Sequence, residues 1–522
     1  MNLKNLFVFS SDENLKTAAP EKKPETLLKG SFISDNALLK SEFAVEKNGD
    51  VKVRNFTLNV GENTLKATVY FIDGLTDKTQ INDFILKPLM IASRELKIQD
   101  VAEVWNILLI QSECSRTKNV GEICRALNYG SAITVIEGFP DAIVIDIKEW
   151  AKRGVDNPQN ENVVRGPADS FTEQIRSNTG ILRRLARSSD FIVEEFTVGT
   201  MSETPCAIMY MKNIVDTKLL DEVRRRVHGV DVDYISSSAE LEALIEDDTY
   251  LTLPQILSTE RPDRTMRAIY EGRVAIVVDG SPFLLILPTT LFDLNDSPED
   301  YYLRYPYVCM TKLVRTLAFI ISLLLSGVYV AAIRFHTELI PTSLLITIIS
   351  SRANVPFPGA LEVVLMEVAL EIIREAGIRI PSSGGLTLSI VGALILGQAA
   401  VSASLVSPVL IIIVSLTALG SFATPNYYIG LSGRMLRFLY IALGYFGGFL
   451  GIAAGLFIHA LVWSGAHSVG IPMVAPYAPK TNRGGAQIMS VPIWRREHRP
   501  DWLNTKKSRQ QPRVARRWAN GK

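Results

Sequence analysis

The chain has 522 residues, with 55 Lys or Arg against 54 Asp or Glu. This length is too great for one ordinary hydrophobic core, so we expect at least two domains. The balanced charge hides an asymmetry, because residues 483–522 contain eleven Lys or Arg against Glu497 and Asp501. A basic tail of this kind is typical of proteins that meet phosphate-rich surfaces.

The composition does not favour an enzyme. The four cysteines form no close pair, the five histidines are scattered, and neither a Walker loop nor a GxSxG motif occurs. Close spacing or such motifs would be needed for a zinc, redox or nucleophilic site. We therefore expect no catalytic residue, no metal and no cofactor.

The N-terminal half reads as soluble. Residues 1–50 are rich in Lys, Glu, Ser and Asn and are predicted to be a mobile segment. The start lacks the long apolar run and cleavage site of a signal peptide. We therefore expect the N-terminal domains to stay in the cytoplasm.

Two pairs of segments recur in the same order, which indicates an internal duplication. "ATVYFIDGLTDKTQINDFI" at Ala67 parallels "AIMYMKNIVDTKLLDEV" at Ala207, and "GSAITVIEGFPDAIVI" at Gly130 parallels "GRVAIVVDGSPFLLIL" at Gly272. Apolar runs alternate with amphipathic helical patterns in both. The sequence predicts two related α/β subdomains, at 51–156 and 206–296.

Several short motifs of the soluble half are candidates for packing or interfaces. Glu137-Gly138 and Asp279-Gly280 each lie between two apolar runs, a strong signal for a hairpin turn, and a ligand-binding role is the weaker alternative. The segment 157–205 is interpreted as a linker with a basic helix, whose face is either solvated or bound to an acidic partner. It contains Arg165, Gly166 and Pro167, and Arg304 follows the second subdomain.

A juxtamembrane helix is predicted at 297–316. Ser297, Pro298 and Asp300 form a helix-start pattern. Four tyrosines follow, of the kind found at bilayer interfaces: Tyr301, Tyr302, Tyr305 and Tyr307. We read 317–464 as a membrane domain.

Four firm spans are expected, at about 317–333, 386–403, 405–423 and 438–463, with a tight turn near Ser404. No charged residue occurs from Pro381 to Gly433, which is enough for two of these spans. An even number of spans places both chain ends on one side, and the basic tail, 465–522, assigns that side to the cytoplasm.

The segment 341–377 is predicted to be a short helical hairpin. "PTSLLITIIS" is too short to cross a bilayer, and the next stretch carries four glutamates. Burying carboxylates against lipid is costly, so Glu367, Glu371 and Glu375 are expected to face water, protein or a cation path. The alternative is an amphipathic helix on the outer surface.

The chain resembles the GerA family, the A subunits of spore nutrient-germinant receptors. The resemblance runs from about Val53 to about Gly455 and rests on long motifs in the same order. They include "YFIDGLTD", "VVRGPADSFTE", "SPEDYY", "FHTELIPTSLL" and "SRANVPFPGALEVVLMEVALEIIREAGIRIP". One departure is "RGPADSFTE", where Ala168, Asp169 and Ser170 stand in place of an expected charged pair and glycine.

This resemblance implies a multi-pass protein of the spore inner membrane, with its N-terminal domain and tail on the core side. The implied partners are a transporter-like B subunit, a C-subunit lipoprotein, membrane lipid and further copies of the chain in a ring, with no nucleic acid. The ring would be a ligand-gated cation channel. Glu362, Glu367 and Glu371 would then concentrate cations, and Val363, Val364 or Met366 would form a constriction.

Other functions stay open from the residues. The chain could be a scaffold that organises the receptor while another subunit conducts. A secondary transporter would need a midplane site at broken helices, for which Ser407-Pro408 gives weak support. The related stage V sporulation paralogue shares the same motifs.

Overall fold

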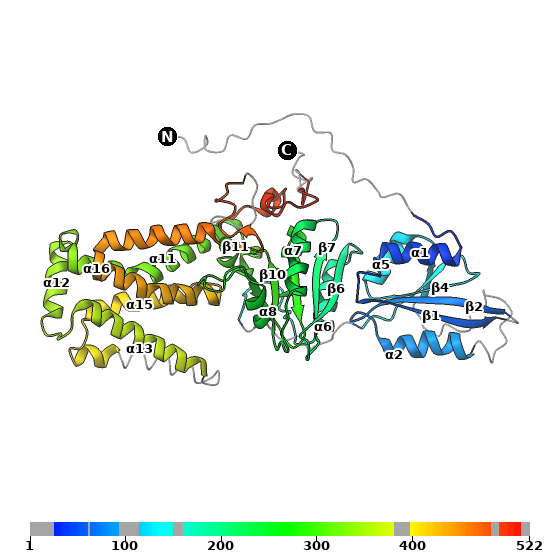
Figure 1. The fold of residues 1–522 in the computed structure, drawn as a ribbon, viewed down its shortest axis with the longest axis horizontal. Coiled ribbons are helices and arrows are strands. Elements are labelled where there is room, and N and C mark those ends of the chain that lie inside the picture. The colour runs from blue at the N-terminus through cyan, green and yellow to red at the C-terminus, as the bar shows by residue number, and fades with distance from the viewer. Residues whose placement is uncertain are drawn as a thin grey trace, which may run out of the picture. The chain divides into compact units, whose positions relative to one another are not determined.

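The computed structural model describes residues 26–60, 63–92, 114–149, 158, 160–379, 397–481 and 490–512. The chain divides into two compact units (Figure 1). The first comprises residues 1–46, 51–150 and 187–189, and the second comprises the remainder. Each unit is built around one five-stranded antiparallel sheet, and the second also contains the helical region.

The first sheet has the strand order β1-β2-β4-β5-β3. Its strands are β1 (Val51–Val60), β2 (Asn63–Ile72), β3 (Cys114–Thr117), β4 (Ala132–Ile136) and β5 (Ala142–Ile145). On one face pack α2 (Lys78–Gln80) and its π-helical continuations (Ile81–Leu86 and Pro88–Ala92). The other face is covered by α1 (Phe32–Glu42) and α5 (Val120–Asn128). Strand β4 is buried along its whole length because both faces are covered.

The N-terminal segment becomes ordered earlier than residue 50, where the sequence predicted mobility to end. Leu39 of α1 and Phe43 after it are buried in the core that α1 shares with β2 and β4. The amphipathic signal was weak because the helix is short and mostly polar. Residues 1–25 lie outside the described residues.

The second sheet repeats the first, with the order β6-β7-β9-β10-β8. Its strands are β6 (Phe191–Val198), β7 (Thr204–Met211), β8 (Leu257–Thr259), β9 (Val274–Val278) and β10 (Leu284–Leu287). Its helices are α6 (Ile175–Ala186), α7 (Thr217–His228), α8 (Ser238–Ile245), α9 (Pro262–Glu271) and α10 (Leu291–Leu294). The prediction of two related α/β subdomains is confirmed, although strand β6 lies in the segment that the sequence assigned to the linker.

The predicted hairpin turns are present in both sheets. Gly138 between β4 and β5 has φ +83°, and Gly280 between β9 and β10 has φ +85°. Glycine is favoured at such positions because it has no Cβ to clash in the left-handed region.

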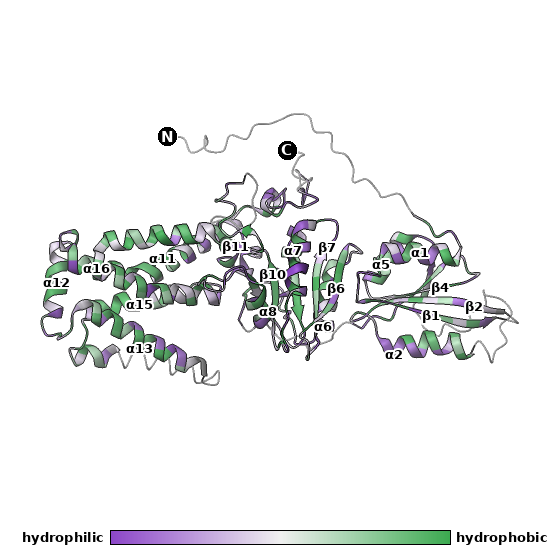
Figure 2. Ribbon diagram, in the orientation of Figure 1, coloured by the Kyte–Doolittle hydropathy of each residue, from purple (hydrophilic) through white to green (hydrophobic). Residues whose placement is uncertain are grey.

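The helical region begins after a 3-10 turn (Pro298–Tyr301). It contains α11 (Tyr305–Phe335), a second 3-10 turn (Thr337–Leu339), α12 (Thr342–Arg352), α13 (Gly359–Arg379), α15 (Pro408–Phe422) and α16 (Tyr427–Gly465). By length and composition, α11 and α16 could each cross a membrane. Figure 2 shows apolar residues along α11, α15 and α16, with more polar residues on α13.

Helix α16 is folded back on itself at Gly448, where φ is +56°. Tyr440 Oη lies 2.8 Å from His459 Nδ1, and a Cβ on Gly455 would meet Leu443, twelve residues earlier. In a straight helix Leu443 and Gly455 would be about 18 Å apart. The single span expected at 438–463 is therefore two antiparallel arms, 427–447 and 449–465.

Other predicted membrane elements are described only in part. The span expected at 386–403 lies mostly outside the described residues. Ser404 has φ +53° in the turn that precedes α15. The segment expected to be a hairpin contains α12 and α13.

The tail returns to the second sheet. Strands β11 (His467–Ser468) and β12 (Ile471–Pro472) follow α16, and 3-10 turns form at Ile493–Arg495 and Asp501–Leu503. Ser468 Oγ donates to the Gln255 carbonyl at 2.6 Å, and Arg499 Nε donates to the Tyr270 carbonyl at 2.7 Å. The described tail is therefore packed against the α/β fold.

Candidate functional site

Helix α13 packs against α11, α15 and α16 and carries four of the five glutamates of residues 305–465. Its Glu362 meets Ser407 before α15, and its Arg374 meets Ser421 at the end of α15, so α13 and α15 run in the same direction. Glu367 meets Ser326 of α11 and Arg437 of α16. The glutamates are thus distributed along the length of a packed helix.

Glu367 has more polar partners than the other predicted cation-path glutamates, Glu362 and Glu371. It is 4% exposed and forms an ion pair with Arg437. It also accepts hydrogen bonds from Ser326 Oγ at 2.7 Å and Thr417 Oγ1 at 3.0 Å. Arg437 donates in turn to the Ser322 carbonyl at 2.7 Å. A buried carboxylate with this many partners is fixed in place.

Glu362 is also buried, at 1% exposure. One carboxylate oxygen accepts from Arg352 Nε of α12 at 3.1 Å, and the other accepts from the Ser407 backbone N–H at 3.1 Å. These contacts connect α12, α13 and the start of α15. In a single chain Glu362 therefore joins three segments.

Glu371 is the most accessible of the three, with 43% of its side chain exposed. Arg374 Nη1 donates to it at 2.9 Å, and Arg434 Nε lies 3.6 Å from its other oxygen. An exposed carboxylate held by two arginines can still meet a solute or a neighbouring molecule.

The predicted apolar constriction residues face the core of the chain. Val363 and Met366 are buried with Tyr329, Leu410 and other residues of α11, α15 and α16, and Val364 packs against this cluster. The opposite face of α13 exposes four apolar side chains at spacings of four, three and four: Leu361, Leu365, Val368 and Ile372. That spacing is typical of a helix face that contacts another helix or lipid.

The arginines that pair with Glu367 and Glu371 were not predicted from the sequence. Arg434 and Arg437 stand just before the apolar run at 438–463, and no role was predicted for them. Two charges three residues apart lie on one helix face, so they could have been matched with the glutamates of α13.

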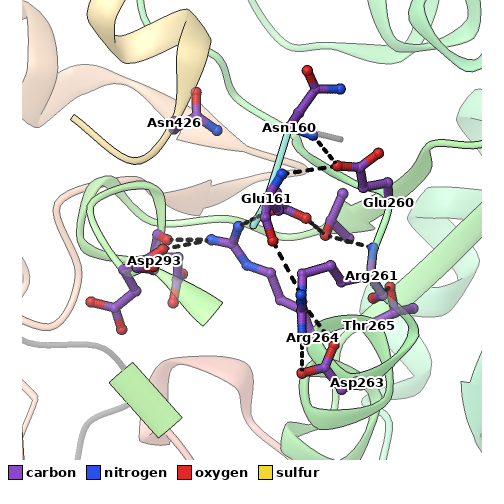
Figure 3. A network of polar contacts seen from close by, with 12 residues as sticks. Asn160, Glu161, Glu260, Arg261, Asp263, Arg264, Thr265, Asp293 and Asn426 are labelled. Carbon is purple, nitrogen blue, oxygen red and sulfur yellow. Dashed lines mark hydrogen bonds and ion pairs between the residues drawn. The ribbon is translucent and has the colours of Figure 1, made fainter. Parts of the chain in front are cut away.

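A second polar network lies between the linker, α9 and the start of the helical region (Figure 3). Glu161 forms an ion pair with Arg264 and accepts from Thr259 Oγ1, while its backbone N–H donates to Glu260 Oε1 at 2.9 Å. Arg261 Nη1 donates to the Glu161 carbonyl at 3.1 Å. The linker is therefore held to α9 by buried charge.

The same network reaches α11. Arg264 Nη2 donates to the carbonyls of Asp293 and Asp296, both at 3.0 Å. Lys312 lies 2.6 Å from Asp296, and Arg315 pairs with Asp300. Burial raises the pKa of Asp296 to about 6, although the charge of Lys312 opposes this shift.

Two of the tyrosines expected at the bilayer interface belong to this junction instead. Tyr301 lies under the Arg267 guanidinium, 3.6 Å from ring centroid to Cζ, and Tyr302 Oη donates to Asp263. Tyr305 and Tyr307 are exposed. Tyr301 and Tyr302 turn inward because α9 offers them charged partners.

The interface candidates around the linker lie at this junction. The Pro167 carbonyl accepts from Arg261 Nη2 at 2.9 Å, and a Cβ on Gly166 would meet the Tyr302 ring. Arg165 is exposed. In "RGPADSFTE", the motif that departs from the expected family pattern, Asp169 pairs with Arg184 of α6 at 2.7 Å.

The remaining interface candidates are the turn residues Asp279 and Gly280, and Arg304. Asp279 Oδ1 accepts from the Ile175 N–H at 2.9 Å at the start of α6, next to Gly280. Arg304 precedes α11 and lines a cavity of about 690 Å³ with Trp494 and Arg496 of the tail. Asp279 therefore has a structural role in the described fold.

Comparisons with known proteins identify the family of this chain. A family model described as Bacillus/Clostridium GerA spore germination protein matches residues 37–502. The chain belongs to the GerA family. Spore germination protein KA of Bacillus subtilis (strain 168) is 37% identical over 485 residues, which cover 92% of this chain and 88% of that protein.

Two further relatives come from the same organism. Spore germination protein B1 is 37% identical over 385 residues, 73% of this chain and 79% of that protein. The uncharacterized membrane protein YfkQ is 33% identical over 452 residues, 86% of this chain and 87% of that protein. A crystal structure of the N-terminal domain of the A subunit of the Bacillus megaterium spore germinant receptor GerK3 is 26% identical, with a TM-score of 0.39, and covers 51% of this chain and 97% of that one.

The chain is thus an A-subunit-type spore germination protein and a membrane protein with two candidate spans. Proteins of this family are generally not enzymes.

Proposed function

We propose that several copies of this chain form a ring in a spore nutrient-germinant receptor and open a ligand-gated path for monovalent cations. The observation that carries the proposal is Glu371, a carboxylate 43% exposed on a helix of the membrane domain. Ionisable groups inside membrane domains are costly and mark ion pathways by default. Glu371 contacts the cation in this proposal.

The other candidate residues support the path from inside the chain. Glu362 and Glu367 fix the position of α13 through Arg352 and Arg437. Val363, Val364 and Met366 pack that helix against its neighbours. A ligand that shifts α13 would change which side chains line the axis of the ring.

The arrangement of the chain suggests its place in the cell. Ile429 near the start of α16 and Met473 just after its end belong to one apolar cluster with the second sheet unit. We infer that the N-terminal domain and the tail share the core side of the spore inner membrane. The partners in this proposal are a transporter-like B subunit, a C-subunit lipoprotein and membrane lipid.

Glu371→Gln tests the cation path. In spores with normal amounts of the protein, measured by immunoblot, the rate of potassium release after germinant addition should change at least roughly twofold, because the local negative charge is lost. Glu338→Gln, in the exposed turn after α11, is the matched control and should release normally. Normal release from both variants would remove Glu371 from the path.

A scaffold role is the second candidate, because Glu362 and Glu367 are already neutralised by arginines within one chain. Flux through liposomes that contain the purified chain alone separates the two roles. A scaffold gives no flux, even with a variant designed to open the path. The related stage V sporulation role would instead be revealed by a defect in spore formation when the gene is deleted.

A further inference from the structure

Arg434, in the second turn of α16, has a buried guanidinium nitrogen without an acceptor among the described residues. The residue is 9% exposed, and its Nε has no hydrogen-bond partner in the described part of the chain. Its closest charged neighbour is a Glu371 oxygen at 3.6 Å. A guanidinium has five N–H donors, and buried donors in native proteins nearly always have acceptors. Arg434 therefore points to an acceptor that the described residues do not supply.

Arg374 faces the same place from α13. Its Nη1 donates to Glu371 at 2.9 Å and its Nη2 donates to Ser421 Oγ at 3.3 Å, but its Nε has no partner within the described part of the chain. Together with Arg437, three guanidinium groups stand against the carboxylates of Glu367 and Glu371. This cluster has one positive charge in excess, so it favours an anion.

Aromatic rings border the two arginines. The Arg374 Cζ lies 5.0 Å from the centroid of the Phe422 ring, and the Arg434 Cζ lies 5.8 Å from that of Tyr427. Both rings are exposed, as is Tyr428. Arginines beside exposed aromatic residues at the ends of apolar helices are typical of the headgroup layer of a bilayer.

The cluster lies at the level where the helical region meets the α/β fold. Ile429 packs with Leu253 and Leu257 of the second sheet unit, and Ser432 donates to the Thr252 carbonyl. Arg434 stands five residues beyond Ile429, about 7.5 Å farther along the helix. It is therefore placed just inside the membrane boundary.

We propose that Arg374 and Arg434 bind the phosphate group of an anionic phospholipid. Phosphate oxygens would accept from the unused N–H donors of both side chains, and the planar fork of arginine suits such a bidentate contact. The excess positive charge offsets the repulsion from Glu371. Exposed apolar side chains on α15 and α16 would contact the acyl chains: Leu416, Leu419, Met435 and Leu439. This site lies next to Glu371 of the proposed cation path, but its phosphate contacts come from the two arginines.

Native mass spectrometry of the detergent-purified full chain tests the proposal. Phosphatidylglycerol should remain bound at several-fold higher occupancy than phosphatidylcholine. Arg434→Gln should lower phosphatidylglycerol affinity about tenfold, because a charge-assisted bidentate contact is lost. The control is Arg334→Gln, in the last turn of α11. Arg334 also lies over an aromatic ring, with its Cζ 4.0 Å from the Tyr445 centroid. It should leave the affinity unchanged.

Three outcomes would overturn the proposal. They are equal retention of the two lipids by the unaltered chain, equal loss in both variants, and displacement of the lipid by inorganic phosphate at the concentration at which phosphate itself occupies the site. The last would assign the site to a free anion. If Arg434→Gln fails to fold by size-exclusion chromatography, the comparison of lipids on the unaltered chain and Arg374→Gln still decide.

Discussion

The two α/β subdomains have the same strand order and different interiors. In the first, Asn119 precedes α5, and its side chain accepts from the Gly121 N–H in an ordinary helix cap. At the equivalent place in the second, Arg261 precedes α9 and makes no such cap. Arg261 reaches instead to the carbonyls of Glu161 and Pro167. One copy keeps local helix chemistry, and the other has exchanged it for contacts with the linker.

This difference indicates which copy takes part in the junction with the membrane region. The second copy buries Arg261, Arg264 and Arg273, and the residues that follow its sheet pair with Lys312 and Arg315 of α11. A duplicated fold can diverge in this way because one copy is sufficient for packing. The charged copy is then available to connect domains.

Of the variants that test this difference between the two copies, removal of Arg264 should cause the largest loss of stability. In Arg264→Met, Glu161 loses its ion-pair partner at a place where its side chain is only 13% exposed, which should cost about 3 kcal/mol. Thermal unfolding of the detergent-purified chain measures the loss. Glu122→Met, on the matching helix α5 of the first copy, is the control and should change little because Glu122 is exposed. Equal effects of the two variants would contradict the contrast between the copies.

Exchanging the helix caps should have an intermediate effect. Asn119→Ala removes an ordinary cap and should cost about 1 kcal/mol. Arg261→Asn restores a cap to α9, yet it should destabilise the chain by more, because it removes contacts with Glu161, Pro167 and Asp263. Denaturant unfolding of each variant checks the order. A more stable Arg261→Asn would show that the linker contacts are weaker than one cap.

The pH dependence of stability should show the smallest effect. The folded pKa of Asp296 is about 6, above its ordinary value of 3.8. Folding therefore favours the protonated form, and this contribution is full below about pH 4 and is lost as pH rises to about 6. Asp296→Asn stays neutral, so the variant should lose less stability than the unaltered chain between these values. If the melting temperatures of the two proteins changed equally with pH across this range, the raised pKa of Asp296 would be excluded.

The sequence was sufficient for features that repeat or that follow local rules. The paired Glu137-Gly138 and Asp279-Gly280 predicted equivalent hairpin turns, which the structure contains. Pro356 and Pro358 separate α12 from α13 because proline cannot continue a helix. Such signals need only neighbours in the chain.

Long-range partners could not be predicted in this way. Arg437 lies seventy residues from Glu367, and the sequence around each residue does not indicate that the other is its partner. The reversal at Gly448 was also hidden, because "GYFGGFLG" stays apolar throughout and reads as one span. Tyr301 and Tyr302 were placed at the bilayer because their aromatic character is local, whereas their charged partners come from α9.

The turn at Gly448 also provides a position for a chemical probe. A Cβ on the adjacent Gly447 would meet no described atom within 4 Å, so a cysteine would fit there. Native Cys114, Cys124, Cys206 and Cys309 all precede the tip by more than a hundred residues. A membrane-impermeant thiol reagent applied from one face of a sealed vesicle would then report directly which way the hairpin points.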